Sequence, residues 1–173
     1  IPIRAKELHL ENDVYRVVFL IRVQKPSDTY VYDVVQSLFP NRNKDFVIAI
    51  DETNIALVKE VKSKKDNNDT EKISKNIIDT LSSELMVKAS VGIGTIVDNI
   101  RDIGRSYKEA QLALQIGAIF EADKSIINYN SLGIGRLVYQ LPTTLCKLFL
   151  NEVFKDGSFD DFDSETLLTI QKF

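Results

Sequence analysis

Two Gly-x-Gly pairs are the residues of this chain whose spacing most suggests phosphate chemistry. Gly92 and Gly94 follow an apolar run, and Gly133 and Gly135 repeat the spacing further along the chain. A Walker-type phosphate loop also requires a lysine followed by a hydroxyl residue, and a dinucleotide loop requires a third glycine at the start of a helix. A valine occupies the third-glycine position after each pair. We therefore interpret the first pair as the end of a strand that another part of the backbone approaches closely.

His9 and Cys146 are the single histidine and the single cysteine, and their types suggest a base and a nucleophile. We do not expect them to act as such, because His9 lies in a polar stretch before the first strand and Cys146 lies in an apolar helical stretch. A free thiol in such a stretch is usually a small core residue. Two ligands cannot complete a zinc site, and one cysteine cannot form an internal disulfide. The sequence therefore predicts no catalytic residue here, and the lone thiol fits a cytoplasmic protein.

An acidic segment near the end of the chain begins like a calcium-binding loop. Asp156, Ser158 and Asp160 have the spacing of its first three ligands. The sixth position, which requires glycine, is Asp161, and the twelfth, which requires glutamate, is Leu167. We therefore expect a solvated turn before a last helix, and no bound cation.

The overall composition is that of an ordinary globular domain. The 173 residues include 22 basic and 25 acidic side chains, which gives a net charge of −3, and 44% of the residues are hydrophobic. This balance argues against tight nucleic-acid binding by the segment itself, and the basic run at 62–65 is interpreted as a solvated loop. No apolar run is long enough to span a bilayer, so we expect a cytoplasmic protein with no membrane partner. The chain begins without methionine and stops within a helical pattern, so we expect it to be a piece of a longer protein.

Alternating strand and helix patterns predict an α+β fold. Runs of β-branched and aromatic residues predict the strands, and apolar residues at helical spacing predict the helices between them. Strands are expected at 14–23, 45–50, 54–61, 86–94 and 125–129, and helices at 31–38, from about 70 to 85 and from about 100 to 122. The first six elements form the split β-α-β arrangement of ferredoxin-like folds, an antiparallel sheet with helices packed on one face.

Several local features of these elements are also predicted. The first strand reads as buried on both faces at its centre. Asn68 or Asp69 is expected to cap the second helix. The buried stripe of that helix is expected to consist of Ile73, Ile77, Leu81 and Leu85, and that of the third helix of Ile103, Tyr107, Ala110, Leu114 and Gly117. Because the sequence pattern becomes helical after Tyr129, we place a domain boundary near Asn130, with an α+β domain at 1–130 and a helical extension at 131–173.

From Val14 to Tyr129 the order of elements resembles the GGDEF nucleotide-cyclase fold, and "KASVGIG" resembles the strand that this family writes with Ser-x-Gly-Ile. The helix "SYKEAQLALQIGAIFEADKSIINY" is more similar to that of the CdaR/PucR group of bacterial transcription regulators, in which a degenerate GGDEF-like domain carries a Ser-Tyr-x-Glu-Ala helix. "DSETLLTIQKF" resembles the helix before the group's C-terminal helix-turn-helix. The group's Tyr-x-x-Leu-Gly-x-x-Arg-Leu segment is matched by Tyr129, Leu132, Gly133, Arg136 and Leu137.

The resemblance implies a non-catalytic regulatory domain that connects an N-terminal sensor with a C-terminal helix-turn-helix of the same longer chain. DNA would then be bound only through that C-terminal segment. The resemblance implies a sugar-diacid or purine-related effector for some members, and nothing in this sequence assigns one. We expect a homodimer, because the helices after Pro142 carry more apolar surface than an isolated appendage needs, although they can also fold back on the sheet domain.

The same resemblance indicates where cyclase activity should be absent. A working cyclase carries Gly-Gly-Asp/Glu-Glu-Phe in the hairpin between its second and third strands, where the glycines admit the substrate and the acids hold Mg²⁺. Here the hairpin reads "IAIDETNIALV", in which Asp51 and Glu52 are acidic but no glycine flanks them, and Asp28 lies too late in its turn to supply a further metal ligand. We therefore expect no cyclase activity, no metal and no cofactor. The alternatives are a divergent cyclase, or a nucleotide or small-metabolite receptor, that uses Asp51 and Glu52.

Overall fold

The computed structural model describes residues 14–24, 30–64 and 67–153. The chain divides into two units, one that ends at Arg136 and one that begins at Leu137. None of the helices in the described ranges is long and apolar enough to cross a membrane. His9, Asp28 and the acidic segment at 156–167 lie outside the described residues, as does the helix predicted at the end of the chain.

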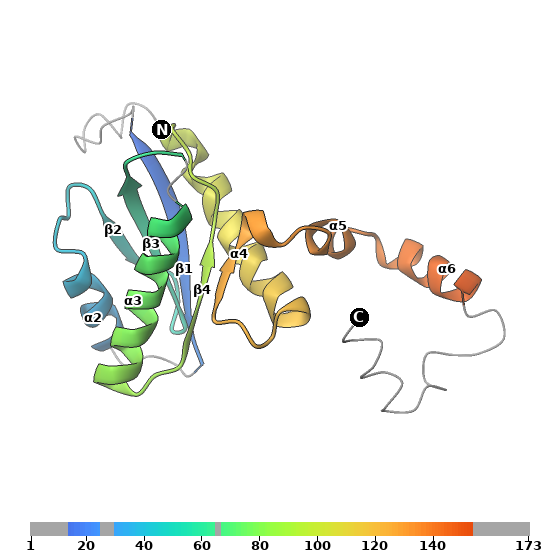
Figure 1. The fold of residues 1–173 in the computed structure, drawn as a ribbon, viewed down its shortest axis with the longest axis horizontal. Coiled ribbons are helices and arrows are strands. Elements are labelled where there is room, and N and C mark those ends of the chain that lie inside the picture. Colours follow the sequence, from blue (N-terminus) through green and yellow to red (C-terminus); the bar gives the residue numbers. More distant parts are fainter. Residues whose placement is uncertain (1–13, 25–29, 65–66, 154–173) are drawn as a thin grey trace. The chain divides into compact units, whose positions relative to one another are not determined.

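One mixed sheet of five strands, in the order β2-β3-β1-β4-β5, forms the centre of the first unit (Figure 1). The central strand β1 pairs antiparallel with β3 and with β4, β2 pairs antiparallel with β3, and β5 pairs parallel with β4. The predicted α+β fold is confirmed, including the tight hairpin between the second and third strands. The strands are β1 (Tyr15–Val23), β2 (Phe46–Ala49), β3 (Asn54–Val61), β4 (Ala89–Ile93) and β5 (Ile126–Asn128).

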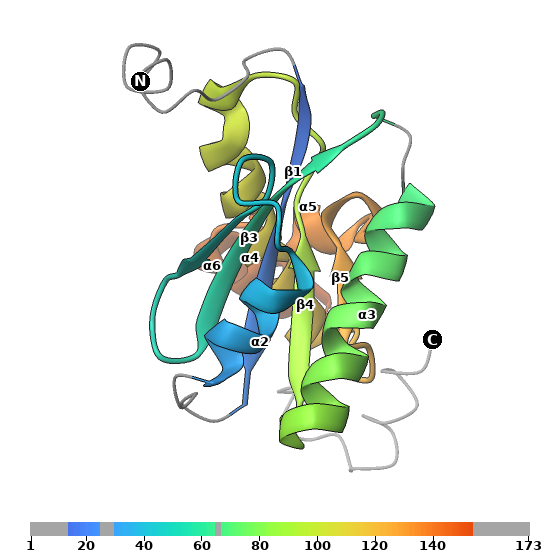
Figure 2. The same cartoon turned by 90° about the vertical axis from the view of Figure 1, so that its left-hand side faces the viewer.

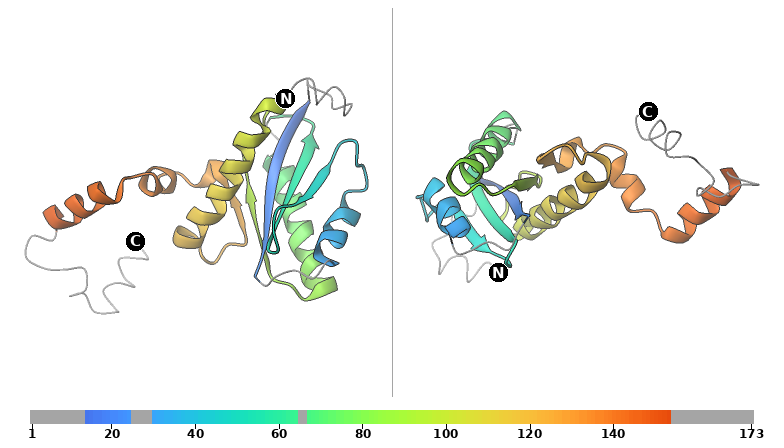
Figure 3. Two further views of the ribbon diagram at one scale, coloured as in Figure 1. Left: turned by 180° about the vertical axis from the view of Figure 1, so that it is seen from behind. Right: turned by 90° about the horizontal axis from the view of Figure 1, so that it is seen from below.

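Helices cover both faces of this sheet. Two helices, α2 (Tyr30–Leu38) and α3 (Asn67–Leu85), pack against each other on one face, as Figure 2 shows. The longest later helix, α4 (Ile103–Phe120), lies on the opposite face (Figure 3). The predicted arrangement of the first two helices on one face is therefore confirmed, and the third helix closes the other side of the sheet.

The position of β1 between two helical layers explains its unbroken apolar sequence. Val17, Phe19 and Ile21 belong to the core under α2 and α3, whereas Val18 and Leu20 belong to the core under α4. A strand that is half-exposed would alternate apolar and polar residues, but a strand covered on both faces needs apolar residues at every position. The prediction that β1 is buried on both faces at its centre is confirmed.

The predicted stripes of the two longer helices are confirmed in outline. On α3, Ile77 and Leu81 are fully buried, and the outer residues Ile73 and Leu85 pack partly buried against the same core. On α4, Ala110, Leu114 and Gly117 are buried, with Ile103 and Tyr107 partly buried at one end.

Two helix starts differ from the prediction. The helix α3 begins at Asn67, so Asn68 and Asp69 lie in its first turn instead of at the cap. There the negative charge of Asp69 still interacts favourably with the positive end of the helix dipole. The helix predicted from about 100 is divided into a 3-10 turn, η1 (Ile100–Asp102), and α4, because the side chain of Asn99 accepts a hydrogen bond from the amide of Arg101 at 2.9 Å and caps the turn.

The chain beyond the sheet is helical, as predicted. A 3-10 turn, η2 (Tyr129–Ser131), is followed by α5 (Gly135–Tyr139) and α6 (Thr143–Val153). No residue of α6 is buried, and its apolar side chains Leu148, Phe149 and Val153 are more than half exposed. The prediction of Cys146 as a small core residue is wrong for the described part of the chain, where its side chain is only half-buried and no residue of α6 is buried.

Candidate functional site

The two acidic residues predicted as ligand candidates lie together in the turn of the β2–β3 hairpin. Asp51 is an acceptor within this turn. Its carboxylate accepts hydrogen bonds from the amides of Thr53 at 2.8 Å and Asn54 at 2.9 Å, and from the Thr53 hydroxyl at 3.0 Å. The side-chain amide of Asn54 donates to both carboxylate oxygens at 2.9 Å. Asp51 therefore closes the turn by satisfying backbone and side-chain donors that follow it.

This turn is tied to the end of the central strand. The amide of Val23 donates to the carbonyl of Thr53 at 2.9 Å, and Nε of Arg22 donates to Oδ1 of Asn54 at 3.1 Å. Asn54 therefore links Arg22 on β1 to Asp51 in the turn. These contacts fix the hairpin turn to the end of β1.

The donor set does not fit the Mg²⁺ of a cyclase. Hydrogen bonds from the Thr53 amide and then from the Asn54 side chain lower the pKa of Asp51, so its carboxylate is charged, but both oxygens already accept hydrogen bonds within the turn. Glu52 is exposed beside it. Among the described residues, no group of three or more histidine, cysteine, aspartate or glutamate side chains is placed to hold a metal ion.

The glycines after β4 have a packing role, as the first interpretation predicted. A Cβ atom on Gly92 would lie 2.2 Å from the carbonyl oxygen of Ala110, and one on Gly94 would lie 2.0 Å from that of Ser106. Both oxygens belong to α4, so the absence of side chains on these glycines lets the helix backbone lie directly on the strand. No phosphate cradle is needed to explain them.

The Ser-Tyr-x-Glu-Ala motif lies in α4, and its Ser106 holds this helix to the sheet. The buried hydroxyl of Ser106 accepts a hydrogen bond from the amide of Val18 at 3.1 Å and donates to the carbonyl of Thr95 at 2.8 Å. The carbonyl of Val18 meanwhile accepts from the amide of Gly94 at 2.9 Å. Ser106 thus supplies a partner to β1 at the point where β4 ends.

Glu109, one turn further along α4, holds the same loop. Its Oε2 accepts hydrogen bonds from the amide of Thr95 at 2.9 Å and from the Thr95 hydroxyl. Its Oε1 forms an ion pair with Nη1 of Arg105 at 3.3 Å. The resemblance in sequence pointed to the motif that contains Ser106 and Glu109 but gave it no role. The hydrogen bonds of these two residues show that the motif is a structural clamp between α4 and the end of β4.

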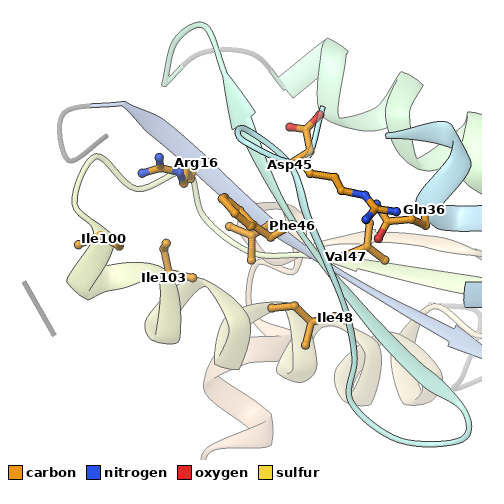
Figure 4. Close-up of a pocket in the computed structure, with 10 residues that line it drawn as sticks. Arg16, Gln36, Asp45, Phe46, Val47, Ile48, Ile100 and Ile103 are labelled. Atoms are coloured by element: carbon orange, nitrogen blue, oxygen red, sulfur yellow. The ribbon is translucent and has the colours of Figure 1, made fainter. Parts of the chain in front are cut away.

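A cavity at the edge strand β2 was not predicted from the sequence. It has a volume of about 540 Å³ and is lined by Arg16, Gln36, Arg42, Asp45, Phe46, Val47, Ile48, Val58, Ile100 and Ile103. Figure 4 shows Phe46 and Ile48 on the side of β2 that carries Ile103, whereas Val47 lies next to Gln36. Asp51 and Glu52 do not line this cavity. The signal in the sequence was the apolar run at 46–50 on a short strand, but its significance depends on how much of this strand α4 leaves uncovered.

The polar residues around this cavity include two ion pairs. Nζ of Lys59 lies 2.7 Å from Oδ2 of Asp45, and Nζ of Lys44 lies 2.8 Å from Oε1 of Glu60. The carboxylate of Asp45 is buried, and it also accepts a longer hydrogen bond, at 3.4 Å, from the amide of Glu60. Both acids at this edge are therefore neutralised by a lysine.

Residues 1–116 match the family described as GGDEF-like domain. The matched region contains β1 to β4 and most of α4, and therefore both the hairpin turn and the helix clamp. No curated protein matches the chain.

Proposed function

This chain belongs to the GGDEF-like domain family, and from that premise we propose that it is a non-catalytic regulatory domain of a bacterial transcription regulator of the CdaR/PucR type. The observation that carries the non-catalytic part is the hairpin turn. Its residues from Ile50 to Asn54 include no glycine, and the carboxylate of Asp51 is occupied by the turn itself. Side chains in this turn would crowd a triphosphate, and a carboxylate with satisfied oxygens is a poor metal ligand.

The local structure of the last residues of the first unit supports the proposal of a CdaR/PucR-type regulator. Arg136 lies over the ring of Tyr129, with its guanidinium carbon 5.0 Å from the ring centroid, and Leu132 between them in sequence is buried. Gly133 has a positive φ of 51°, a backbone conformation that glycine adopts without strain. These four residues belong to the segment that resembles the CdaR/PucR group, and here they form one local fold.

In the proposed role the domain transmits a signal within a longer chain. It would connect an N-terminal sensor to a C-terminal helix-turn-helix, and a homodimer would place two such helix-turn-helix segments on DNA. An effector that binds one arrangement of the dimer more tightly shifts the population toward it. The rigid clamp of α4 on the sheet suits this role, because a shift at one end of a rigid element is carried to the other.

The non-catalytic part is tested by incubating the purified chain with GTP or ATP and Mg²⁺ and separating the products by chromatography. We expect no cyclic dinucleotide and no release of pyrophosphate. A variant with both Asp51→Ala and Glu52→Ala serves as the control, because any trace turnover that it retains comes from a contaminant. Turnover by the wild-type chain that this variant loses would establish a divergent cyclase and refute the proposal.

The regulator part is tested with the complete reading frame. We expect it to encode a helix-turn-helix after Phe173, and the full-length protein to protect a specific DNA segment from nuclease digestion. The chain of residues 1–173 alone should give no protection, because its net charge of −3 provides no general attraction to DNA. A full-length protein without specific DNA binding would refute this part and leave the result of the nucleotide assay unaffected.

A further inference from the structure

The face of the sheet under α4 is covered unequally. The helix α4 packs on β1, β4 and β5, and beyond it Ile48 of the edge strand β2 and Ile50 just after this strand are exposed to solvent, at 47% and 44% of their surface. The cavity at the β2 edge lies here. Phe46, Ile48 and Val58 line it from the sheet, and Ile100 and Ile103 line it from the turn and the first residue of the helix.

The size and lining of this cavity are those of a small-molecule site. Its volume of about 540 Å³ lies within the range of roughly 300–1,000 Å³ that is common for ligand pockets. Six of its ten lining residues are apolar, and the other four are Arg16, Gln36, Arg42 and Asp45. An apolar wall with a few polar groups favours a ligand that has an apolar body and one polar end.

The charged residues at the cavity indicate the charge that the polar end of the ligand should carry. Three charged residues line the cavity, namely Arg16, Arg42 and Asp45, and the carboxylate of Asp45 is paired with Nζ of Lys59 at 2.7 Å. Within the described part of the chain, the exposed guanidinium of Arg42 forms no ion pair, and it presents several donors at the rim of the cavity.

We propose that this cavity binds a small amphipathic monocarboxylate, with its alkyl or aryl body against Phe46, Ile48 and Val58 and its carboxylate on Arg42. Arg16, which is only 2% exposed, forms part of the wall. A guanidinium matches a carboxylate with two parallel hydrogen bonds, whereas it gives an alcohol or an amine no such partner. The site is separate from Asp51 and Glu52, and the binding requires neither a cyclase nor DNA.

The test is calorimetric titration of the full chain with four probes: octanoate, 3-phenylpropionate, octanol and octylammonium. We expect the two carboxylates to bind about tenfold more tightly than octanol, and octylammonium to bind most weakly, because a charged hydrogen bond contributes on the order of a tenfold change in affinity. Equal binding of octanol and octanoate would overturn the proposal, since the cavity would then be only an apolar groove. No binding of either carboxylate at millimolar concentration would overturn it as well.

Matched variants locate the binding. Ile48→Glu places a negative charge in the cavity at a residue already half-exposed, and we expect it to abolish carboxylate binding. Ile119→Glu makes the same change on the exposed surface of α4, away from the cavity, and should keep wild-type affinity. Arg42→Glu should weaken octanoate at least about tenfold, whereas Lys108→Glu, which makes an equal change of charge, should alter affinity little.

The outcomes of these titrations are distinct from those of the proposed function. Octanoate binding that survives both Ile48→Glu and Arg42→Glu would place the ligand elsewhere and refute the site. If the wild-type chain bound GTP and Ile48→Glu abolished this binding, the cavity would be a nucleotide site, and the proposed ligand class would be refuted. Neither result touches the assays for cyclic dinucleotide and for DNA protection, which stand or fall by their own readouts.

Discussion

Gly94 lies against the backbone of Ser106 so closely that a Cβ atom on the glycine would be 2.0 Å from the serine carbonyl oxygen. The hydroxyl of the same serine bonds the amide of Val18 and the carbonyl of Thr95 on either side of this contact. The backbones of α4 and of the chain leaving β4 therefore touch directly, and one serine side chain satisfies the polar groups around the contact. Catalysis is not needed to account for either residue.

Replacing Gly94 with alanine should destabilise the domain strongly. The added methyl group would meet backbone atoms, which cannot rotate away, so α4 must move from the sheet; overpacking of this kind costs about 1–3 kcal/mol or more. Urea denaturation of the purified variant measures the loss. The matched control is Gly104→Ala. Gly104 lies in the first turn of α4, where an added Cβ would have no atom within 4 Å, so this substitution should stabilise the helix by up to about 1 kcal/mol. Equal effects of the two substitutions would contradict the close contact.

Replacing Ser106 with alanine should remove a hydrogen-bond partner that no water can replace. Ser106 is fully buried, and without its hydroxyl the amide of Val18 loses its acceptor, at a cost of about 1–3 kcal/mol in unfolding free energy. Ser74→Ala is the control, because Ser74 is equally buried but its hydroxyl bonds only the Thr70 carbonyl of its own helix. We expect a clearly smaller loss for Ser74→Ala, and thermal and chemical denaturation should agree on the order.

The sequence predicts the elements of this fold better than it predicts their contacts. Periodicity identifies β1 and the stripe of α3 because burial requires apolar residues at positions that the local geometry determines. The contact of Ser106 with Val18 joins residues 88 positions apart, and no local pattern indicates it. The cavity at the β2 edge depends in the same way on where α4 begins relative to a strand far from it in the sequence. The family resemblance pointed to Ser106 and Glu109, but only their distances to Thr95 and Val18 give them a role.

Replacing Glu109 with alanine should loosen the loop that follows β4. The carboxylate accepts from both the amide and the hydroxyl of Thr95, so its removal leaves a partly buried amide without its acceptor, at a cost of about 1.5–3 kcal/mol. Glu109→Gln keeps one acceptor oxygen and should lose less. Glu84→Ala, an exposed position on α3, should change stability by less than about 0.5 kcal/mol. Faster amide hydrogen exchange at Thr95 in Glu109→Ala, with unchanged exchange in β3, would locate the effect; uniform acceleration across the sheet would argue against a local clamp.

Replacing Asp51 with alanine should weaken the hairpin in a way that depends on pH. The Thr53 amide and the Asn54 side chain lower the pKa of Asp51 in the folded protein below its unfolded value of about 3.9. The stabilising contribution of the carboxylate is therefore fully present above that unfolded value, and it is lost as the pH falls through the folded pKa. We expect Asp51→Ala to be less stable than the wild type in urea at neutral pH, and the difference to shrink as the medium becomes acidic.

Two further variants separate the turn role of Asp51 from a role in ligand binding. Asp51→Asn keeps one acceptor oxygen for the amides of Thr53 and Asn54, so it should be intermediate in stability and should remove the part of the pH dependence that Asp51 contributes. Glu52→Ala should leave stability nearly unchanged at every pH, because its exposed side chain lies outside the hydrogen bonds of the turn. If Asp51→Ala were as stable as the wild type at neutral pH, the carboxylate would not be holding the turn, and its oxygens would again be candidates for a ligand.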